Sequence, residues 1–455
     1  MDRQARVLVV AIVVSFIAFL DGAVINVALP SLAEELGGGL ALQQWAVDAY
    51  LLTLGSLILL AGSLSDSYGR LRIIRIGLAG FAVTSVLCAI APTGLFFVVS
   101  RAFQGAAGAL LVPSSLALIV ATFAPADQGR AIGRWTAWTT GAFLIGPLFG
   151  GLLVDLVSWR LVFWINLLPI AFALVLMHRL GRDEPNPDHE RIDWLGAALG
   201  IVGLAGTVFA LIEQGRFGWS SPVVFVPLVV GVLALVLFVL QERRTAQPML
   251  PLTLFAARNF AMGNLATVFI YAAFSLGPFA MTIFLQEFGG FSATMAGLAT
   301  LPPTIVLVLL GSRFGELSGR FGPRLFMTLG PIIVGVGYLL TLVVDEDFVY
   351  WWQFLPGVIV IGVGMAMTVA PLTSAILGAV EPSRAGIGSA VNNAVARIAG
   401  LIAIASISVI AGSQLDVDGY RRTALFVAVA LVIGGAISWF GIRNPRLAPE
   451  RAASA

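Results

Sequence analysis

Long apolar stretches alternate with short polar segments along almost the whole chain. Each stretch runs for about 20 residues without the period-two alternation of a half-buried strand, so each predicts a helix long enough to cross roughly 30 Å of hydrocarbon. Fourteen such segments are expected, which places both termini on one side of a membrane. They lie near residues 7–29, 43–64, 73–91, 94–118, 131–154, 159–178, 193–212, 221–240, 260–285, 293–312, 325–344, 351–377, 386–411 and 421–441.

The composition supports an all-α membrane protein. Of the 455 residues, 59% are hydrophobic and 11% are charged, whereas soluble domains carry about 25% charged residues. A chain this apolar needs lipid as its solvent, and its 50 glycines suit close packing of helices in a bilayer. Arg3 and Arg6 precede the first apolar stretch as they would in a signal peptide. That stretch continues past Asp21 without a convincing cleavage site, so it is predicted to be a retained first helix.

The distribution of arginine predicts the orientation. All 26 basic residues are arginines, and apart from Arg101 and Arg397, which lie deep within spans, 20 of them fall on the side of the termini. Only four fall on the other side, namely Arg160, Arg216, Arg421 and Arg422. By the positive-inside rule, both termini are expected in the cytoplasm, and the protein is expected to be a multi-pass protein of the cytoplasmic (inner) membrane.

Three short sequence matches at nearly one offset indicate an internal repeat. They pair Gly62–Gly69 with Gly315–Gly322, Arg130 with Arg384, and Pro113 with Pro371. The paired segments cross the membrane in the same direction, which predicts two six-helix halves related by an axis along the membrane normal. The halves are expected at residues 1–178 and 259–442. An inserted helix pair with its flanking loops occupies 179–258, and a cytoplasmic tail covers 443–455.

A tight charged turn joins the second and third predicted spans on the cytoplasmic side. Its residues are Gly62, Asp66, Gly69, Arg70 and Arg72. Asp66 can pair with a neighbouring arginine or cap a facing helix, and such a contact would act as a gate latch if it formed in only one conformation. The alternative is an ordinary basic turn. Gly319 replaces the acid in the second copy, so a latch is expected only in the first half.

The fifth predicted span carries a cluster of glycines around one proline. The residues are Gly141, Gly146, Pro147, Gly150 and Gly151. Proline removes a backbone hydrogen bond and bends the helix, and the glycines make a smooth face for a close helix crossing. Taken by itself, the pattern therefore predicts tight packing.

Three charged residues lie deep inside the first-half spans: Asp21, Asp48 and Arg101. Charges within a span are costly and are by default a functional hypothesis. At about 1.5 Å per residue, Asp21 lies roughly 20 Å from the cytoplasmic end of its helix, and the other two lie roughly 7–10 Å from their outer ends. All three are thus expected at one level, where they would form a proton-coupling site. The alternative is a static ion pair with a spare acid.

Further polar and aromatic residues of the spans are candidates for lining a substrate cavity. They are Asn26, Gln104, Trp138, Phe143, Phe274, Asn392 and Asn393. Helix packing is the alternative for each of them. Arg397 is the only charge deep in the second half, and helix packing is the expected role of its neighbourhood.

Together these motifs resemble the fourteen-span branch of the drug:proton antiporters, within the major facilitator superfamily. The resemblance covers nearly the whole chain and includes Leu-Asp21-x-x-x-x-Asn26-x-Ala-Leu-Pro, Trp45-x-x-Asp48-x-Tyr and Trp159-Arg160-x-x-Phe163-x-Ile-Asn166-x-x-Pro169. It implies the major facilitator fold and efflux of amphipathic, often cationic, compounds in exchange for protons.

The same resemblance assigns roles to several motifs. Arg101 matches the arginine tied to proton coupling, the charged turn matches the superfamily's cytoplasmic-loop motif, and the glycine–proline cluster matches the antiporter motif of exporters. One departure concerns the substrate. Some exporters of cations carry acids in their second-half spans, and none is seen in this sequence, so the charge of the substrate stays open.

The expected function is proton-coupled export of amphipathic small molecules by alternating access, as in multidrug or antibiotic efflux. The alternatives are a specific exporter of one natural product or lipid, and a proton-coupled importer. An enzyme is not expected, because no catalytic cluster or nucleotide-binding loop is present. One cysteine, Cys88, and two histidines in one loop, His178 and His189, predict no metal and no cofactor. The expected partners are the small-molecule substrate, protons and the lipid bilayer, with no nucleic acid and no obligate protein partner.

Overall fold

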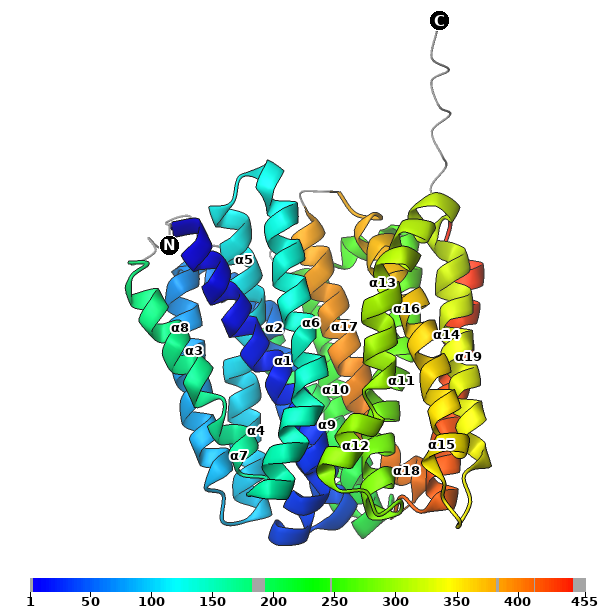
Figure 1. Cartoon of the computed structure of the whole chain (residues 1–455). Helices are drawn as coiled ribbons and strands as arrows, with labels where there is room; N and C mark the ends of the chain where they lie inside the picture. The colour runs from blue at the N-terminus through cyan, green and yellow to red at the C-terminus, as the bar shows by residue number, and fades with distance from the viewer. Residues whose placement is uncertain (1–2, 182–192, 246–247, 382–383, 413, 445–455) are drawn as a thin grey trace, which may run out of the picture.

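The computed structural model describes residues 3–181, 193–245, 248–381, 384–412 and 414–444. Within these ranges it is a bundle of helices without a strand (Figure 1). Segment 182–192, with His189, and the predicted tail beyond residue 444 lie outside the described residues. The helices are α1 (Arg3–Leu36), α2 (Gly39–Tyr68), α3 (Arg70–Ala89), α4 (Gly94–Ala109), α5 (Val112–Thr122), α6 (Pro125–Leu156), α7 (Leu161–Trp164), α8 (Leu167–His178), α9 (Trp194–Phe217), α10 (Pro222–Arg244), η1 (Leu252–Ala256), α11 (Arg258–Glu287), α12 (Ala293–Ala299), α13 (Pro302–Phe321), α14 (Pro323–Leu340), η2 (Thr341–Val343), α15 (Tyr350–Gln353), α16 (Leu355–Leu377), α17 (Ala385–Ala405), α18 (Ile407–Ala411) and α19 (Val417–Gly441).

The prediction of fourteen spans is confirmed: the described residues contain 14 helical segments long and apolar enough to cross a membrane. Several spans consist of two consecutive helices. The span Gly94–Thr122 is broken between α4 and α5, just before Pro113, and Ala293–Phe321 is broken between α12 and α13, just before Pro302. A proline within the first turn of the second helix explains both breaks, because it cannot donate to the preceding turn.

The start of α1 and the end of α19 lie at the same end of the bundle, at the top of Figure 1. This end is called the inner end below, and the opposite end is called the outer end. We refer to α1–α8 as the first-half helices and to α11–α19 as the second-half helices. The domain boundaries predicted from the repeat stay a prediction.

The apolar core is shared at the outer end and divided at the inner end. The largest cluster joins residues of both sets of helices, among them Ala28 and Leu42 with Phe284 and Ile404. Towards the inner end, a separate cluster around Phe81 belongs to first-half helices, and another, around Phe260, draws its buried members from the second half and from Leu254 of η1. Since apolar burial is the main favourable term in such contacts, the two sets of helices are held together chiefly at the outer end.

The inserted helices α9 and α10 form a tight pair. A Cβ at Gly206 would lie only 2.4 Å from the backbone oxygen of Pro227, so glycine is needed where the two helices cross. Helix α9 also packs against α2 and α17, and the Trp45 indole donates a hydrogen bond of 2.9 Å to Glu213. The pair is thus attached where first-half and second-half helices meet.

Candidate functional site

An arginine–aspartate pair lies buried among the first-half helices. The Arg101 guanidinium, on α4, lies 2.6 Å from a carboxylate oxygen of Asp21, on α1. Both side chains are about 1% exposed, so this pair is almost completely removed from solvent. The Nε of Arg101 donates to the backbone oxygen of Ala46 at 2.9 Å, which adds a contact to α2. A buried charge needs both a counter-charge and hydrogen bonds, and this one has both.

Neutral polar side chains complete the network around the pair. Gln104 accepts from Arg101 at 2.7 Å and donates to Asp21 at 3.2 Å and to Ser85 at 2.9 Å. Asn166 donates to Asp21 at 3.0 Å. The network therefore ties α1, α3 and α4 to the start of α8, and it fixes the charged pair in one geometry.

Asp48 is not part of this network. It is fully buried on α2, and neither of its carboxyl oxygens has a hydrogen-bond partner among the described residues. Gln44, one helical turn earlier, donates to the backbone oxygens of Ile404 and Ala405 on α17, at 3.0 and 2.9 Å. Residues four apart share a helix face, so Asp48 lies on the face of α2 that meets α17. The predicted trio is thus a buried pair, Asp21 with Arg101, and a separate acid.

The glycine–proline cluster of α6 makes two close contacts near the outer end. A Cβ at Gly146 would lie 2.7 Å from the Cβ of Ala23, and one at Gly151 would lie 2.5 Å from the Cα of Thr294. On the opposite helix, a Cβ at Gly297 would lie 2.4 Å from the backbone oxygen of Pro147. The cluster therefore packs α6 against α1 on one side and against α12 on the other. Gly150 also faces α1, whereas Gly141 has open space around it.

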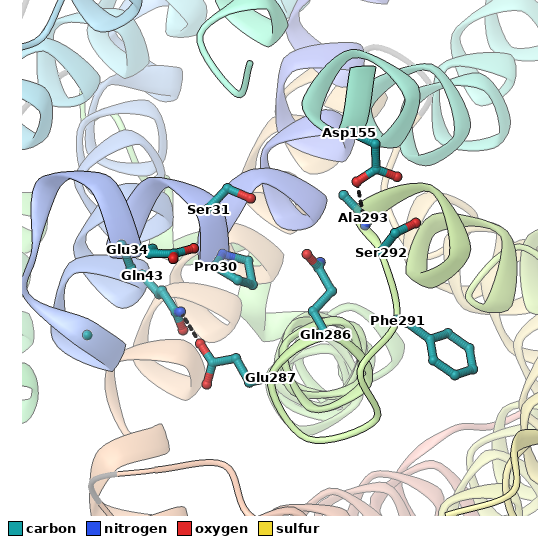
Figure 2. A pocket seen from close by; sticks show the side chains of 12 residues that line it. Pro30, Ser31, Glu34, Gln43, Asp155, Gln286, Glu287, Phe291, Ser292 and Ala293 are labelled. Carbon is teal, nitrogen blue, oxygen red and sulfur yellow. Dashed lines mark hydrogen bonds between the residues drawn. The ribbon is translucent and has the colours of Figure 1, made fainter. Parts of the chain in front are cut away.

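Polar contacts join the two sets of helices at the same end (Figure 2). Asp155, near the end of α6, accepts hydrogen bonds from the backbone nitrogens of Ala293 and Thr294 at the start of α12, at 3.0 and 2.8 Å. Gln43 donates to Glu287 at 2.5 Å. A carboxylate at a helix N-terminus satisfies free backbone donors and interacts favourably with the helix dipole. We call these contacts, with those of Gly151 and Gln44, the outer closure.

The outer closure and one further bond beside it account for all the hydrogen bonds that the described part of the chain forms between first-half and second-half helices. Besides those of Gln43, Gln44 and Asp155, there is one from Gln286 to the backbone oxygen of Val27, at 3.2 Å. A pocket at this end is lined by Pro30, Glu34, Gln43 and Gln286, among other residues (Figure 2). It lies on the outer side of the closure, away from Arg101.

The charged turn between α2 and α3 lies at the inner end. Asp66 pairs with Arg70 at 3.0 Å, and both side chains are substantially exposed. Gly69 has φ 94°, a left-handed conformation that favours glycine, and Gly322 has φ 84° at the equivalent place between α13 and α14. The two turns therefore share backbone geometry at the offset predicted for the repeat. Gly62 has open space around it, and Arg72 is exposed.

The residues predicted to line a cavity separate into two groups. Gln104 and Asn392 hydrogen-bond to neighbouring side chains: Gln104 belongs to the buried network, and Asn392, which is partly exposed, donates to Asn264 and Thr267 on α11, at 3.1 and 3.0 Å. The others keep exposed surface. The rings of Phe143 and Phe19 pack with their centres 5.6 Å apart, and those of Phe274 and Tyr271 with their centres 5.7 Å apart. The remaining partly or largely exposed residues are Asn26, Trp138 and Asn393.

Comparison with protein families identifies the chain. The model of the Major Facilitator Superfamily matches residues 11–404 and, in a second match, 263–455. The protein belongs to the major facilitator superfamily. It is therefore a member of a family of transporters, and the resemblance of its motifs to that family is confirmed.

Several relatives of this transporter confer resistance or export a compound. The methylenomycin A resistance protein of Bacillus subtilis is 34% identical over 89% of this chain and 87% of its own length. The puromycin resistance protein pur8 of Streptomyces alboniger is 31% identical over 98% of this chain and 93% of its own. The cephamycin export protein CmcT of Amycolatopsis lactamdurans is 31% identical over 89% of this chain and 85% of its own length.

Solved structures match the fold of this transporter. A peptide transporter POT in complex with sulfate gives a TM-score of 0.71 at 15% identity, covering 96% of this chain and 97% of that one. A bacterial homolog of the human lysosomal transporter Spinster gives a TM-score of 0.69 at 17% identity, and the match covers 97% of both chains. The major facilitator fold predicted from the sequence is thereby confirmed.

Several residues of this transporter were not assigned a role by sequence reasoning. Ser85 and Asn166 complete the buried network, and Asp155 caps α12. Asn166 belongs to a recognised motif, so its polarity within an apolar span was the available signal. The sequence around Asp155 carried no such signal, because its hydrogen-bond partners lie 138 and 139 residues away along the chain. Among the described residues, no group of three or more potential metal ligands lies together.

Proposed function

We propose that this transporter exports amphipathic small molecules across the cytoplasmic membrane by alternating access, in exchange for protons. The observation that carries export is the similarity over most of the chain to proteins named for methylenomycin A resistance, puromycin resistance and cephamycin export. A shared architecture over such a length supports a shared direction of transport. The glycine–proline cluster of α6, which resembles the antiporter motif, supports the same direction.

The proposed orientation places the inner end in the cytoplasm, because 20 of the 24 arginines other than Arg101 and Arg397 fall on that side. The structure then corresponds to a state that is closed towards the outside. The pair Asp66–Arg70 lies within its own turn in this state. This geometry supports a latch that forms its cross-contact only when the inner end closes, with Asp66, Arg70 and Arg72 as its charged groups and Gly62 and Gly69 allowing the approach.

Asp48 is the proposed proton carrier. It lies on the face of α2 that meets α17, inside the outer closure. An unpaired carboxylate buried there costs far more free energy than the neutral acid. Protonation of Asp48 from the outside therefore favours closure of the outer end, which couples proton binding to the conformational change. The Asp21–Arg101 pair is the proposed partner of this step, because Arg101 also holds α2 through the backbone oxygen of Ala46.

Inside-out vesicles with an acidic lumen test this proposal. Two amphipathic dyes of opposite charge, fluorescein and rhodamine 123, report uptake, which is measured after filtration and lysis at fixed pH. We expect uptake of at least one dye to require the pH gradient and to fall in Asp48→Asn to the level seen with an uncoupler. Asp347→Asn, in an exposed outer loop, is the matched control and should transport like the wild type.

Two results would contradict the proposal. Uptake that survives both the uncoupler and Asp48→Asn would refute proton exchange. Movement of dye only out of the vesicles would instead support import. A second candidate function is export of one natural product, which the single compounds named for these three relatives favour. It predicts that most amphipathic dyes fail while one compound of a natural-product panel is transported with the same proton dependence.

A further inference from the structure

Arg397 is a cation in the middle of a span, and it has no ion-pair or hydrogen-bond partner among the described residues. It lies on α17, and the described residues give its guanidinium neither a hydrogen bond nor an ion pair, although this group has five donors and stays charged in proteins. Arg101, the other arginine deep within a span, is bound to Asp21, Gln104 and the backbone of Ala46. A structural arginine in a membrane is expected to be satisfied in that way, so Arg397 needs another explanation.

The surroundings of Arg397 come from both sets of helices. Its guanidinium carbon lies 6.0 Å from the centre of the Phe19 ring on α1, and its Cβ would lie 3.6 Å from a Cβ at Gly55 on α2. Tyr50 and Tyr271 are the ionisable groups within its electrostatic reach, and no carboxylate is among them. The residue is mostly buried but keeps some exposed surface. An accessible, uncompensated positive charge thus lies between the first-half and second-half helices.

Aromatic rings adjoin this charge. The centre of the Phe19 ring lies 5.6 Å from that of Phe143 on α6, and the centre of the Tyr271 ring lies 5.7 Å from that of Phe274 on α11. These rings keep exposed surface. The site also lies on the inner side of the outer closure, because Gly55 is eleven residues, or about 16 Å, further along α2 than Gln44. A molecule entering from the inner end would meet the cation and the rings before the closure.

We propose that Arg397 binds an anionic group, such as a carboxylate, of the transported compound, so that the substrate is an amphipathic organic anion. This inference rests on the proposed function of export. The planar guanidinium matches a carboxylate in two parallel hydrogen bonds, and its donors are free to make them. The aromatic rings supply an apolar surface for the rest of the molecule. A cationic group at the same place would be repelled, and the second-half helix α17 offers it no acid.

The test compares wild type with Arg397→Gln, Arg397→Lys and the control Arg216→Gln, an exposed arginine at the end of α9. The probes are fluorescein, which is anionic at pH 7.5, and rhodamine 123, a cation with a related ring system. Initial rates in inside-out vesicles give KM and maximal rate for each dye. Thermal unfolding of the purified variants shows that each one is folded.

We expect the wild type to transport fluorescein. Arg397→Gln should raise the KM for fluorescein about 10- to 100-fold, the range corresponding to lost hydrogen bonds with a charged group. Arg397→Lys should keep part of the affinity, Arg216→Gln should match the wild type, and any rhodamine 123 transport should persist or improve. A role in helix packing would instead lower the rates for both dyes together.

Four outcomes would overturn the inference. The first is fluorescein transport with an unchanged KM in Arg397→Gln. The second is equal loss of both dyes in a folded Arg397→Gln protein. The third is a wild type that transports rhodamine 123 but not fluorescein, which leaves the proposed export intact and removes only the anion site. A wild type that transports neither dye contradicts the proposed export of amphipathic compounds and, with it, the inference built on it.

Discussion

Replacing Gly151 by alanine should open the outer end of the transporter. The added Cβ would lie 2.5 Å from the Cα of Thr294 and 2.7 Å from the backbone oxygen of Ala293. Both contacts are to the backbone of α12, so no flexible side chain can move aside. Ordinary van der Waals contact begins at 3.4 Å, and α6 and α12 would therefore have to separate by about 1 Å.

Under the proposed alternating access, the cost falls on one conformation only. Overpacking of this kind costs about 1–3 kcal/mol, and α6 and α12 are expected to separate when the outer end opens. The ratio of closed to open molecules should therefore fall by about 5- to 150-fold. Gly141→Ala is a matched control on the same helix and in the same motif, because nothing lies within 4 Å of a Cβ there. It should leave the ratio unchanged.

Spin labels report this change directly. We place them at Pro92 and Asp347, which are exposed in outer loops of the two sets of helices, in a Cys88→Ala background. The distance distribution should shift towards longer distances in Gly151→Ala and should stay the same in Gly141→Ala. If both variants keep the wild-type distribution, the close approach at Gly151 does not maintain the outer closure and the reasoning is wrong.

Two further predictions concern the buried pair and the orientation. Arg101→Leu leaves Asp21 without its cation, which should lower the free energy of unfolding by about 3–5 kcal/mol. Thermal unfolding measures the loss, and adding Asp21→Asn to the same protein should restore part of the stability. An unchanged melting temperature in Arg101→Leu would contradict the pairing. In the Cys88→Ala background, the variant Asp345→Cys should react with an impermeant maleimide in intact cells, whereas Arg72→Cys should react only after permeabilisation. The reverse pattern would refute the cytoplasmic placement of the termini.

The spans were predictable because a bilayer leaves few alternatives. Backbone groups in hydrocarbon must bond within their own segment, so a run of about 20 apolar residues has to be a helix. The charged turn and the glycine–proline cluster were recognisable for a similar reason, since Gly69 adopts a left-handed conformation and Gly151 touches backbone. At such positions the backbone geometry itself restricts the residue type.

Lateral contacts were less accessible to sequence reasoning. Counting residues along helices placed Asp21, Asp48 and Arg101 at one depth, but depth does not show which way a side chain points around its helix axis. Asp21 meets Arg101, whereas Asp48 lies on the face of α2 that meets α17. The glycine cluster shows the same limit, because Gly141 and Gly151 look alike in the motif and only one of them approaches a neighbouring helix.

The contact between α2 and α17 connects the two proposals. Asp48 and Gly55 lie seven residues apart on α2, or about 10 Å, and Arg397 packs against Gly55. If Asp48 takes up the proton and Arg397 holds the anion, each one needs the outer part of this contact to separate before it can reach the outside. Proton entry and anion release would then depend on one movement. Such sharing couples the two sites without direct contact between them, and it predicts that Gly151→Ala alters both proton dependence and anion affinity through the same shift in population.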